Sequence, residues 1–460
     1  DSKVLYVMLG LSLLVIVGVA SISFHPKPAD KGLEAICERF PGNRLGMGFG
    51  GRSGPLRYEI EHFQQLNNAK PWNGVYSFHL LVREVPVRNA EGKEESSEAS
   101  FPAIVWFWGL QREDSNLSAE DREARKRLLA MREQVQNLPP EELKKFFTVK
   151  ALEEVSKVSD AQMERFIREQ LAAYGGLETT EVRLQSRKPK EYTFSVDAQG
   201  RSETYRTWPH TSSYLFGAIR PQQEEPIGVN VFGIENELIG TWGAGIAMLI
   251  ATIITAFYIP SLLHKGTVDL LLVKPVRRST LLIYKYVGGL TFMFLNTLFV
   301  VVGIWLALGL RSGLWAPGFL LGILTLTFEF AIFYAVSVFF GVLTRSAVVS
   351  ILMSCFLWLV LFVVGKGYQF VEAVRGVDML PKWLVTTADI AHFVLPRYKD
   401  IDALNSQAIA HDLIGADNPM RKGMDKLFAS IKWGESIGFS TAFIAVMLSL
   451  ACWWFATRDY

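Results

Sequence analysis

The run LIGTWGAGIAMLIATIITAFYIPSLL, residues 238–263, carries no charged residue along its whole length. A membrane-spanning helix needs ~20 mostly apolar residues to cross the hydrocarbon core, so this run is long enough to span. Further long apolar runs share its character and lie at residues 4–24, 286–310, 317–342, 346–365 and 436–457. Only one of the six holds a charge, Glu329. Together they predict a mainly α-helical membrane protein, a six-helix bundle, rather than the core of a soluble one.

The first run has a second interpretation, because an apolar segment near an N-terminus can be a secretory signal peptide. The apolar stretch of residues 4–24 is longer than the usual ~7–15 residues of such a signal, and Ser21-Ile22-Ser23 is a weak cleavage site. We therefore favour a retained membrane helix. The sequence begins at Asp1 without a methionine, so we expect that residues are missing before it.

Composition and motif content exclude several classes of protein. Half of the residues are apolar, 20% are charged and the net charge is +2, which gives no reason to expect a nucleic-acid partner. The three cysteines, Cys37, Cys355 and Cys452, are too dispersed for a disulfide framework or a metal cluster. Residues 46–51, GMGFGG, match a dinucleotide fingerprint without the strand and helix that it needs. No phosphate-binding loop or hydrolase motif occurs, so we assign no catalytic, cofactor or metal residue.

Positive charge in the short loops sets the predicted orientation. Loops rich in Lys and Arg stay in the cytoplasm, and residues 263–285 hold Lys265, Lys274, Arg277, Arg278 and Lys285. With six spans, both termini are then cytoplasmic and the protein lies in the cytoplasmic (inner) membrane. The predicted organisation is a first span in 1–24, an extracytoplasmic domain in 25–236, spans two to five in 237–365, an extracytoplasmic segment in 366–435, and the sixth span with the C-terminus in 436–460.

Residues 25–236 are numerous enough for a domain with its own core, and their pattern predicts an α+β fold. Capping boxes at 118–121 and 159–162 open helices, Gly175-Gly176 closes the last of them, and residues 117–175 form a charged helical insertion. Period-two alternation follows Asn73-Gly74 and predicts a strand there. The other predicted strands lie at 101–108, 191–196, 204–208, 213–219 and 227–234.

The loop between the second and third spans carries a short helix signal. Thr267 is suited to cap a helix, Asp269 lies in its first turn, and Pro275 stops it. The enclosed residues are apolar, so two interpretations stay open. The segment is either a loop lying in the lipid headgroups, or a rigid short helix inserted into a groove on a cytoplasmic partner.

The run GTVDLLLVKPVRR at 266–278, followed by Leu281-Leu282, Lys285 and Gly288-Gly289, resembles the signature of ABC transporter permeases of the second, exporter type. This resemblance implies a half-transporter that pairs with a second permease copy in the lipid bilayer. It also implies that ATP is bound by a separate cytoplasmic ATPase subunit, on which the loop docks as a coupling helix. The residues that it assigns to this helix are Gly266, Thr267, Val268, Asp269, Leu270, Leu271, Lys274, Pro275, Arg277 and Arg278.

Glu329 lies near the middle of its apolar run, where a charged carboxylate costs about 2.5–3.5 kcal/mol on insertion scales. One interpretation is a protonated side chain that hydrogen-bonds to Thr325, Thr327 or Tyr334. The other is a group lining the substrate path or the seam between two permease copies.

The favoured function is export driven by ATP hydrolysis on the partner chain. In a second hypothesis the same stroke moves the outer domain mechanically and nothing is transported. In a third, residues 25–236 form a membrane-anchored enzyme of the cell envelope. A polar-lined cavity between the spans would favour transport, whereas a closed apolar bundle would favour mechanical work.

Overall fold

The computed structural model describes residues 2–45, 52–53, 55–88, 94–95, 100–110, 122–123, 126, 158–221, 224–258, 260, 277–374, 380–429 and 431–457. The chain divides into two compact units. A helical unit comprises residues 1–24, 212–221 and 228–460, and an α+β unit comprises residues 25–211 and 222–227.

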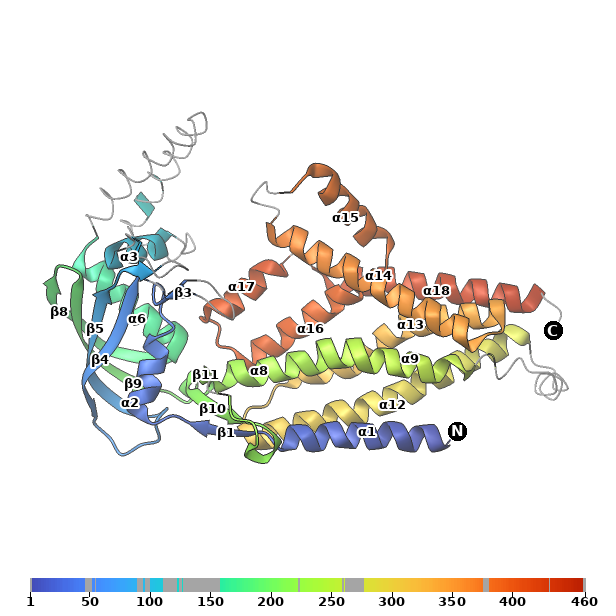
Figure 1. Ribbon diagram of the computed structural model, residues 1–460, viewed down its shortest axis with the longest axis horizontal. Coiled ribbons are helices and arrows are strands. Elements are labelled where there is room, and N and C mark those ends of the chain that lie inside the picture. The colour runs from blue at the N-terminus through green and yellow to red at the C-terminus, as the bar shows by residue number, and fades with distance from the viewer. Residues whose placement is uncertain are drawn as a thin grey trace. The chain divides into compact units, whose positions relative to one another are not determined.

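Five helices in the described residues are long and apolar enough to cross a membrane (Figure 1). They are Ile227–Ala256, Arg278–Ser312, Pro317–Thr344, Ala347–Glu372 and Trp433–Thr457. The first predicted run forms α1 (Ser2–Ala20), whose apolar part, Tyr6–Ala20, is shorter. Each predicted run is therefore helical over most of its described residues, while the count of six spans and their orientation stay predictions.

The second predicted span belongs to a longer helical stretch of three parts. These are α8 (Ile227–Glu237), a π-helical section η3 (Leu238–Ala247) and α9 (Met248–Ala256). The strand predicted at 227–234 is wrong, because its alternating apolar residues lie in α8 and a short apolar run fits a buried helix as well as a strand. The helix therefore begins before the predicted domain boundary at 236.

Helix α13 (Gly322–Thr344), preceded by the short helix η4 (Pro317–Leu321), is the central element of the helical unit. Within its apolar window 67% of the residues are buried, against 17% for α14 (Ala347–Val374). It packs against α9, α12 (Arg278–Ser312), α14 and α18 (Trp433–Thr457). A Cβ on Gly289 of α12 would lie 2.5 Å from the ring of Tyr334, so glycine is needed at this crossing.

The described part of the segment 366–435 is largely helical, and two of its helices pack onto the apolar ones. Helix α14 runs past the predicted end of the fifth span at 365, and α15 (Lys382–Val394), α16 (Tyr398–Leu413) and α17 (Pro419–Leu427) follow. Helix α16 contacts α13, α14, α18 and η4. Asp412 of α16 accepts a hydrogen bond from the Gly318 nitrogen of η4 at 2.6 Å. A Cβ on Gly318 would lie 2.7 Å from the Ala408 oxygen, so the two backbones approach closely.

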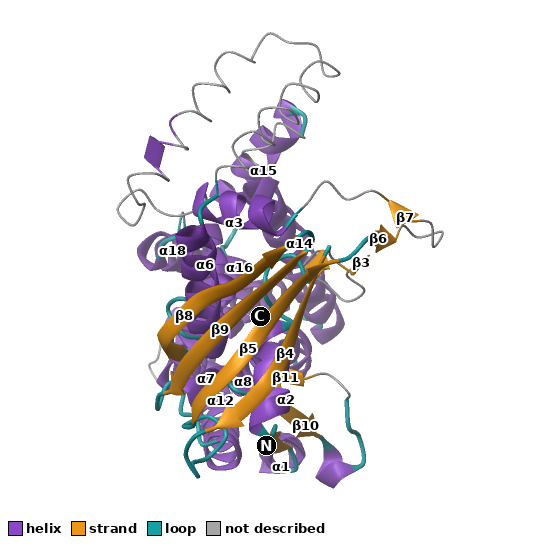
Figure 2. Cartoon of the chain, turned by 90° about the vertical axis from the view of Figure 1, so that its left-hand side faces the viewer, coloured by secondary structure: helices purple, strands orange, loops and turns teal. Residues whose placement is uncertain are grey.

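The α+β unit is built on an antiparallel sheet in the order β4-β5-β9-β8 (Figure 2). The strands are β4 (Leu56–Gln65), β5 (Val75–Glu84), β8 (Leu177–Lys188) and β9 (Glu191–Gly200). Alternate residues of the strands, such as Phe78 and Phe194, join one core with residues of α2 (Ala29–Cys37), α3 (Phe101–Leu110) and α6 (Asp160–Gly175).

Short elements complete this part of the chain. They are β1 (Ser23–Pro26), β2 (Arg44–Leu45), β3 (Arg52–Ser53), β6 (Val87–Arg88), β7 (Glu94–Glu95), α7 (Thr204–Thr207), β10 (Pro209–Ser213), η2 (Leu215–Gly217) and β11 (Glu224–Pro226). The register of β10 on β11 pairs Pro209 with Pro226.

In the α+β unit, some of the predicted helix caps and strands are confirmed and others are wrong. The capping box at Ser159 and Gln162 is confirmed, as is the helix end at Gly176, which has φ of 62°. The strand after Asn73-Gly74 is confirmed as β5, and residues 191–196 lie in β9. The strands predicted at 101–108, 204–208 and 213–219 are wrong, since these residues hold α3, α7 and η2. The capping box at 118–121 lies outside the described residues, as does most of the insertion before residue 158.

Candidate substrate cavity between the helices

A cavity of about 660 Å³ lies within the helical unit, between the α8–η3–α9 stretch, α14, α16 and α17. Its volume is in the range of pockets that hold one small molecule. Its lining combines aromatic and aliphatic side chains with charged and amide groups. The lining residues are Phe232, Asn236, Glu237, Gly240, Thr241, Gly245, Ile246, Leu249, Trp358, Phe362, Lys366, Gln369, Lys399, Asp402, Ala403, Ser406, Met424 and Phe428.

The side of α14 that lines the cavity changes character along its length. Trp358, Phe362, Lys366 and Gln369 recur at helical spacing and therefore share one face of the helix. The first two are aromatic and the last two are polar. This face gives the cavity an apolar part and a polar part.

Helix α16 supplies an ion pair to the polar part. Lys399 and Asp402 are joined by a short contact one turn apart, and their side chains are 9% and 12% exposed. The Lys399 ammonium also lies 4.7 Å from the ring centroid of Tyr398 and 5.7 Å from that of Phe362. Such cation–π contacts are strongest where water is excluded. Lys399 is thus held in place by a carboxylate and two rings.

Glu329 of α13 lies next to this ion pair. Its side chain is fully buried, and its carboxyl group interacts electrostatically with Asp402 and Lys399. No well-formed hydrogen bond reaches its carboxyl oxygens from the described residues, but the Asp402 carboxyl group lies close enough to interact with them. The Thr327 hydroxyl, one of the predicted partners, donates instead to the Ile323 oxygen.

The sequence interpretation missed the charged neighbours of Glu329. They come from α16, which lies in the segment 366–435 and was assigned to the space outside the membrane. The available signal was the polar run at 397–402, RYKDID, which contains both Lys399 and Asp402. A carboxyl group that is isolated in an apolar segment requires a partner. This run lies between the last two predicted spans in the sequence, and it supplies charged groups.

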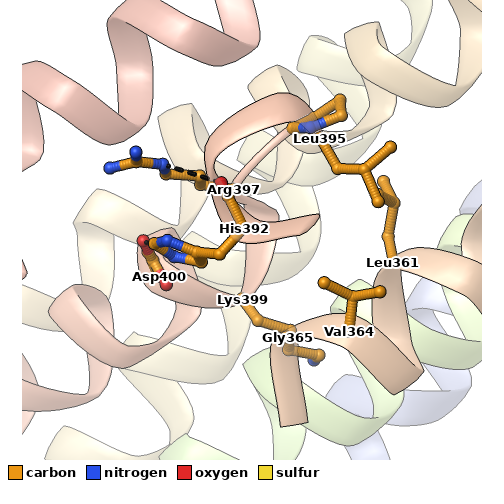
Figure 3. A pocket seen from close by; sticks show the side chains of 9 residues that line it. Leu361, Val364, Gly365, His392, Leu395, Arg397, Lys399 and Asp400 are labelled. Atoms are coloured by element: carbon orange, nitrogen blue, oxygen red, sulfur yellow. Dashed lines mark hydrogen bonds and ion pairs between the residues drawn. The ribbon is translucent and has the colours of Figure 1, made fainter. Parts of the chain in front are cut away.

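A second polar cluster joins four helices but leaves no room for a ligand, and Figure 3 shows two of its side chains, His392 and Asp400. The His392 Nε2 atom of α15 lies 2.8 Å from an Asp400 oxygen of α16, and the Ser436 hydroxyl of α18 donates to the same oxygen at 3.3 Å. The ring of Tyr368, on α14, stacks on His392 with 3.6 Å between centroids. The adjoining cavity has a volume of about 10 Å³, about one water molecule. We assign this cluster a structural role.

The predicted coupling helix falls largely outside the described residues. This applies to Gly266, Thr267, Val268, Asp269, Leu270, Leu271, Lys274 and Pro275. Arg277 is the residue before α12, and Arg278 is the first residue of that helix. Helix α12 therefore begins before the predicted third span at 286 and includes Lys285. No group of three or more potential metal ligands was found among the residues that were described.

The comparison with protein families identifies the class of protein. The family model described as "ABC-2 family transporter protein" matches residues 99–460. The chain therefore belongs to the ABC-2 transporter family, whose members are membrane-embedded permease subunits of ABC transporters rather than catalytic subunits. No curated protein and no solved structure matched the chain.

Proposed function

We propose that this chain is the permease subunit of an ATP-driven exporter, and that ATP is hydrolysed on a separate cytoplasmic ATPase chain. The observation that supports transport is the cavity between the α8–η3–α9 stretch, α14, α16 and α17, because its lining includes Lys366, Lys399 and Asp402. Charged groups among membrane helices are costly unless they are paired or face a water-filled path. A bundle that only transmitted force would have no use for such a lining.

In the proposed mechanism, ATP binding draws two ATPase subunits together and moves the coupling segments of two permease copies. The sequence places this segment at 267–275, between the second and third apolar runs. The movement switches the helices around the cavity between two packed arrangements. The chain itself performs no chemistry, binds no cofactor, and lies in the cytoplasmic membrane with both termini inside the cell.

Affinity purification of the tagged chain from its native membranes tests the proposal. Wild type should recover an ATPase with Walker motifs, and Asp269→Ala and Leu271→Ala should each reduce this recovery about tenfold. Asp417→Ala and Leu324→Ala are matched controls, since both side chains are exposed and lie far along the sequence from the loop. If no ATPase is recovered with wild type, or if both loop variants recover as much as wild type, the proposal is wrong.

One observation favours a second candidate, in which the ATPase stroke moves the outer domain. Residues 25–211 with 222–227 form a compact unit with its own core, as a domain that transmits force would need. The two candidates make different predictions for the cavity. If Thr241, which lines the cavity, is replaced by Trp, an exporter loses transport, whereas a mechanical device keeps its action on the envelope.

A further inference from the structure

Two exposed side chains of opposite charge line the cavity and form no salt bridge in the described part of the chain. They are Glu237, at the end of α8, and Lys366, on α14. Both lie within helices that are apolar and long enough to span a membrane. Each charge is costly there unless water or a ligand solvates it. The other two charged lining residues, Lys399 and Asp402, pair with each other, and Asp402 also interacts electrostatically with Lys366.

The charges mark one end of the cavity on both helices. Along α8–η3–α9 the lining runs from Phe232, Asn236 and Glu237 to Ile246 and Leu249, and along α14 it runs from Trp358 and Phe362 to Lys366 and Gln369. The two stretches run in opposite directions (Figure 1). Glu237 and Lys366 therefore lie toward the same end, where Phe232 also lines the cavity, and Ile246, Leu249, Trp358 and Phe362 lie toward the other end.

We propose that the cavity binds one amphiphilic molecule with a zwitterionic head group, and this rests on the proposed function as a transporter. Glu237 contacts the cationic part of the head group and Lys366 contacts the anionic part. The hydrocarbon chain lies along Leu249, Trp358 and Phe362. A purely anionic ligand would place its charge beside the Glu237 carboxylate, and a purely cationic ligand would place its charge beside the Lys366 ammonium. Placing like charges side by side in this way is unfavourable.

Photo-labelling of the purified full-length chain in nanodiscs tests this inference. Three probes carry the same diazirine-bearing alkyl chain and differ only in the head group, which is phosphocholine, phosphate or trimethylammonium. We expect the phosphocholine probe to label peptides within 232–249 and 358–369 about tenfold more than either singly charged probe. A two-chain phosphocholine probe that labels better than the single-chain probe would identify the source of the ligand as a bilayer lipid.

Charge-removing variants make the test specific. Glu237→Gln should bring phosphate labelling up to that of phosphocholine, and Lys366→Gln should do so for trimethylammonium. Lys382→Gln on α15 is the matched control and should keep the wild-type order, because Lys382 is exposed and does not line the cavity. The ratio of probes is measured within one preparation, so partial misfolding does not mimic the result.

Equal labelling by the three probes in wild type would overturn the inference, as would an unchanged order of probes in both variants. The assay contains no ATPase. A failure of the proposed function therefore appears as an absent ATPase in the purification, and a failure of this inference appears as a lost preference for the head group.

Discussion

Glu329 of α13 and Asp402 of α16 bring two carboxyl groups together inside the helical unit, with the Lys399 ammonium as their shared cation. The two residues come from parts of the chain with opposite character, an apolar span and a polar connecting segment. The proximity of Asp402 and Lys399 explains how the Glu329 carboxyl group is accommodated in the middle of an apolar helix. It also links the wall of the cavity to the most buried helix of the unit.

Glu329→Gln and Asp402→Asn should differ in their effect on stability. Glu329→Gln keeps the shape of the side chain, so we expect it to leave thermal unfolding and ATPase recovery near wild type while it impairs export. Asp402→Asn leaves the ammonium of Lys399 without its carboxylate, and breaking a buried pair in this way costs about 3–5 kcal/mol. Thermal unfolding followed by tryptophan fluorescence measures both.

The double variant Lys399→Gln/Asp402→Asn is the control for this pair. It removes both charges, so it should recover much of the stability that Asp402→Asn loses. Equal unfolding temperatures for the single and double variants would show that the ion pair does not stabilise α16. Export at the wild-type rate by Glu329→Gln would end the functional interpretation of that residue.

The crossing of α12 and α13 depends on one of two adjacent glycines. A side chain on Gly289 would overlap the ring of Tyr334, whereas a Cβ on Gly288 meets no heavy atom within 4 Å. We expect Gly289→Val to destabilise the helical unit by about 1–3 kcal/mol, the usual cost of overpacking. Gly288→Val, its matched control, should change stability far less. Thermal unfolding in detergent compares the two variants, and an equal loss of stability in both would contradict this packing of α12 on α13.

The α+β unit should lose stability in mildly acidic solution because of His210. Burial lowers the pKa of His210 from its ordinary 6.5 to about 4, although Nδ1 lies 2.8 Å from the Trp208 oxygen. The folded state therefore favours the neutral ring. Its stabilising contribution is complete above pH 6.5 and falls as the pH drops toward 4, by about 3 kcal/mol in total.

Hydrogen exchange of β9 and β10 in the full chain, measured between pH 7 and pH 4, reports this loss. His210→Asn retains a donor for the Trp208 oxygen and removes the titrating ring, so its protection should depend less on pH than that of wild type. If the pH dependence is the same in both proteins, another group is responsible.

Much of the helical unit could be predicted from the sequence, because a long uncharged run has few structural alternatives to a membrane-spanning helix. The run 436–457 was placed within three residues of the start of α18 for this reason. The capping box at Ser159 was equally readable, because its two hydrogen bonds are local. Each of these two signals is contained in a short, continuous stretch of sequence.

The missed features depend on contacts between distant residues. Apolar residues at 101–108 and 227–234 suit a strand or a buried helix, and the choice is made by packing that the sequence does not display. The charged neighbours of Glu329 come from α16, whose polar composition suggested a place outside the membrane. The cavity was not predicted at all, because its lining comes from elements separated by more than a hundred residues.

If a partner ATPase opens and closes the cavity, the solvent accessibility of Thr241 should depend on the bound nucleotide. Thr241 is exposed and lines the cavity, so Thr241→Cys should react with a membrane-impermeant maleimide. In the complex with its ATPase, we predict that trapping with ATP changes the labelling rate at least about tenfold relative to ADP, while the rate at the native Cys355 stays constant. The same rate at Thr241→Cys in both nucleotide states would contradict the account.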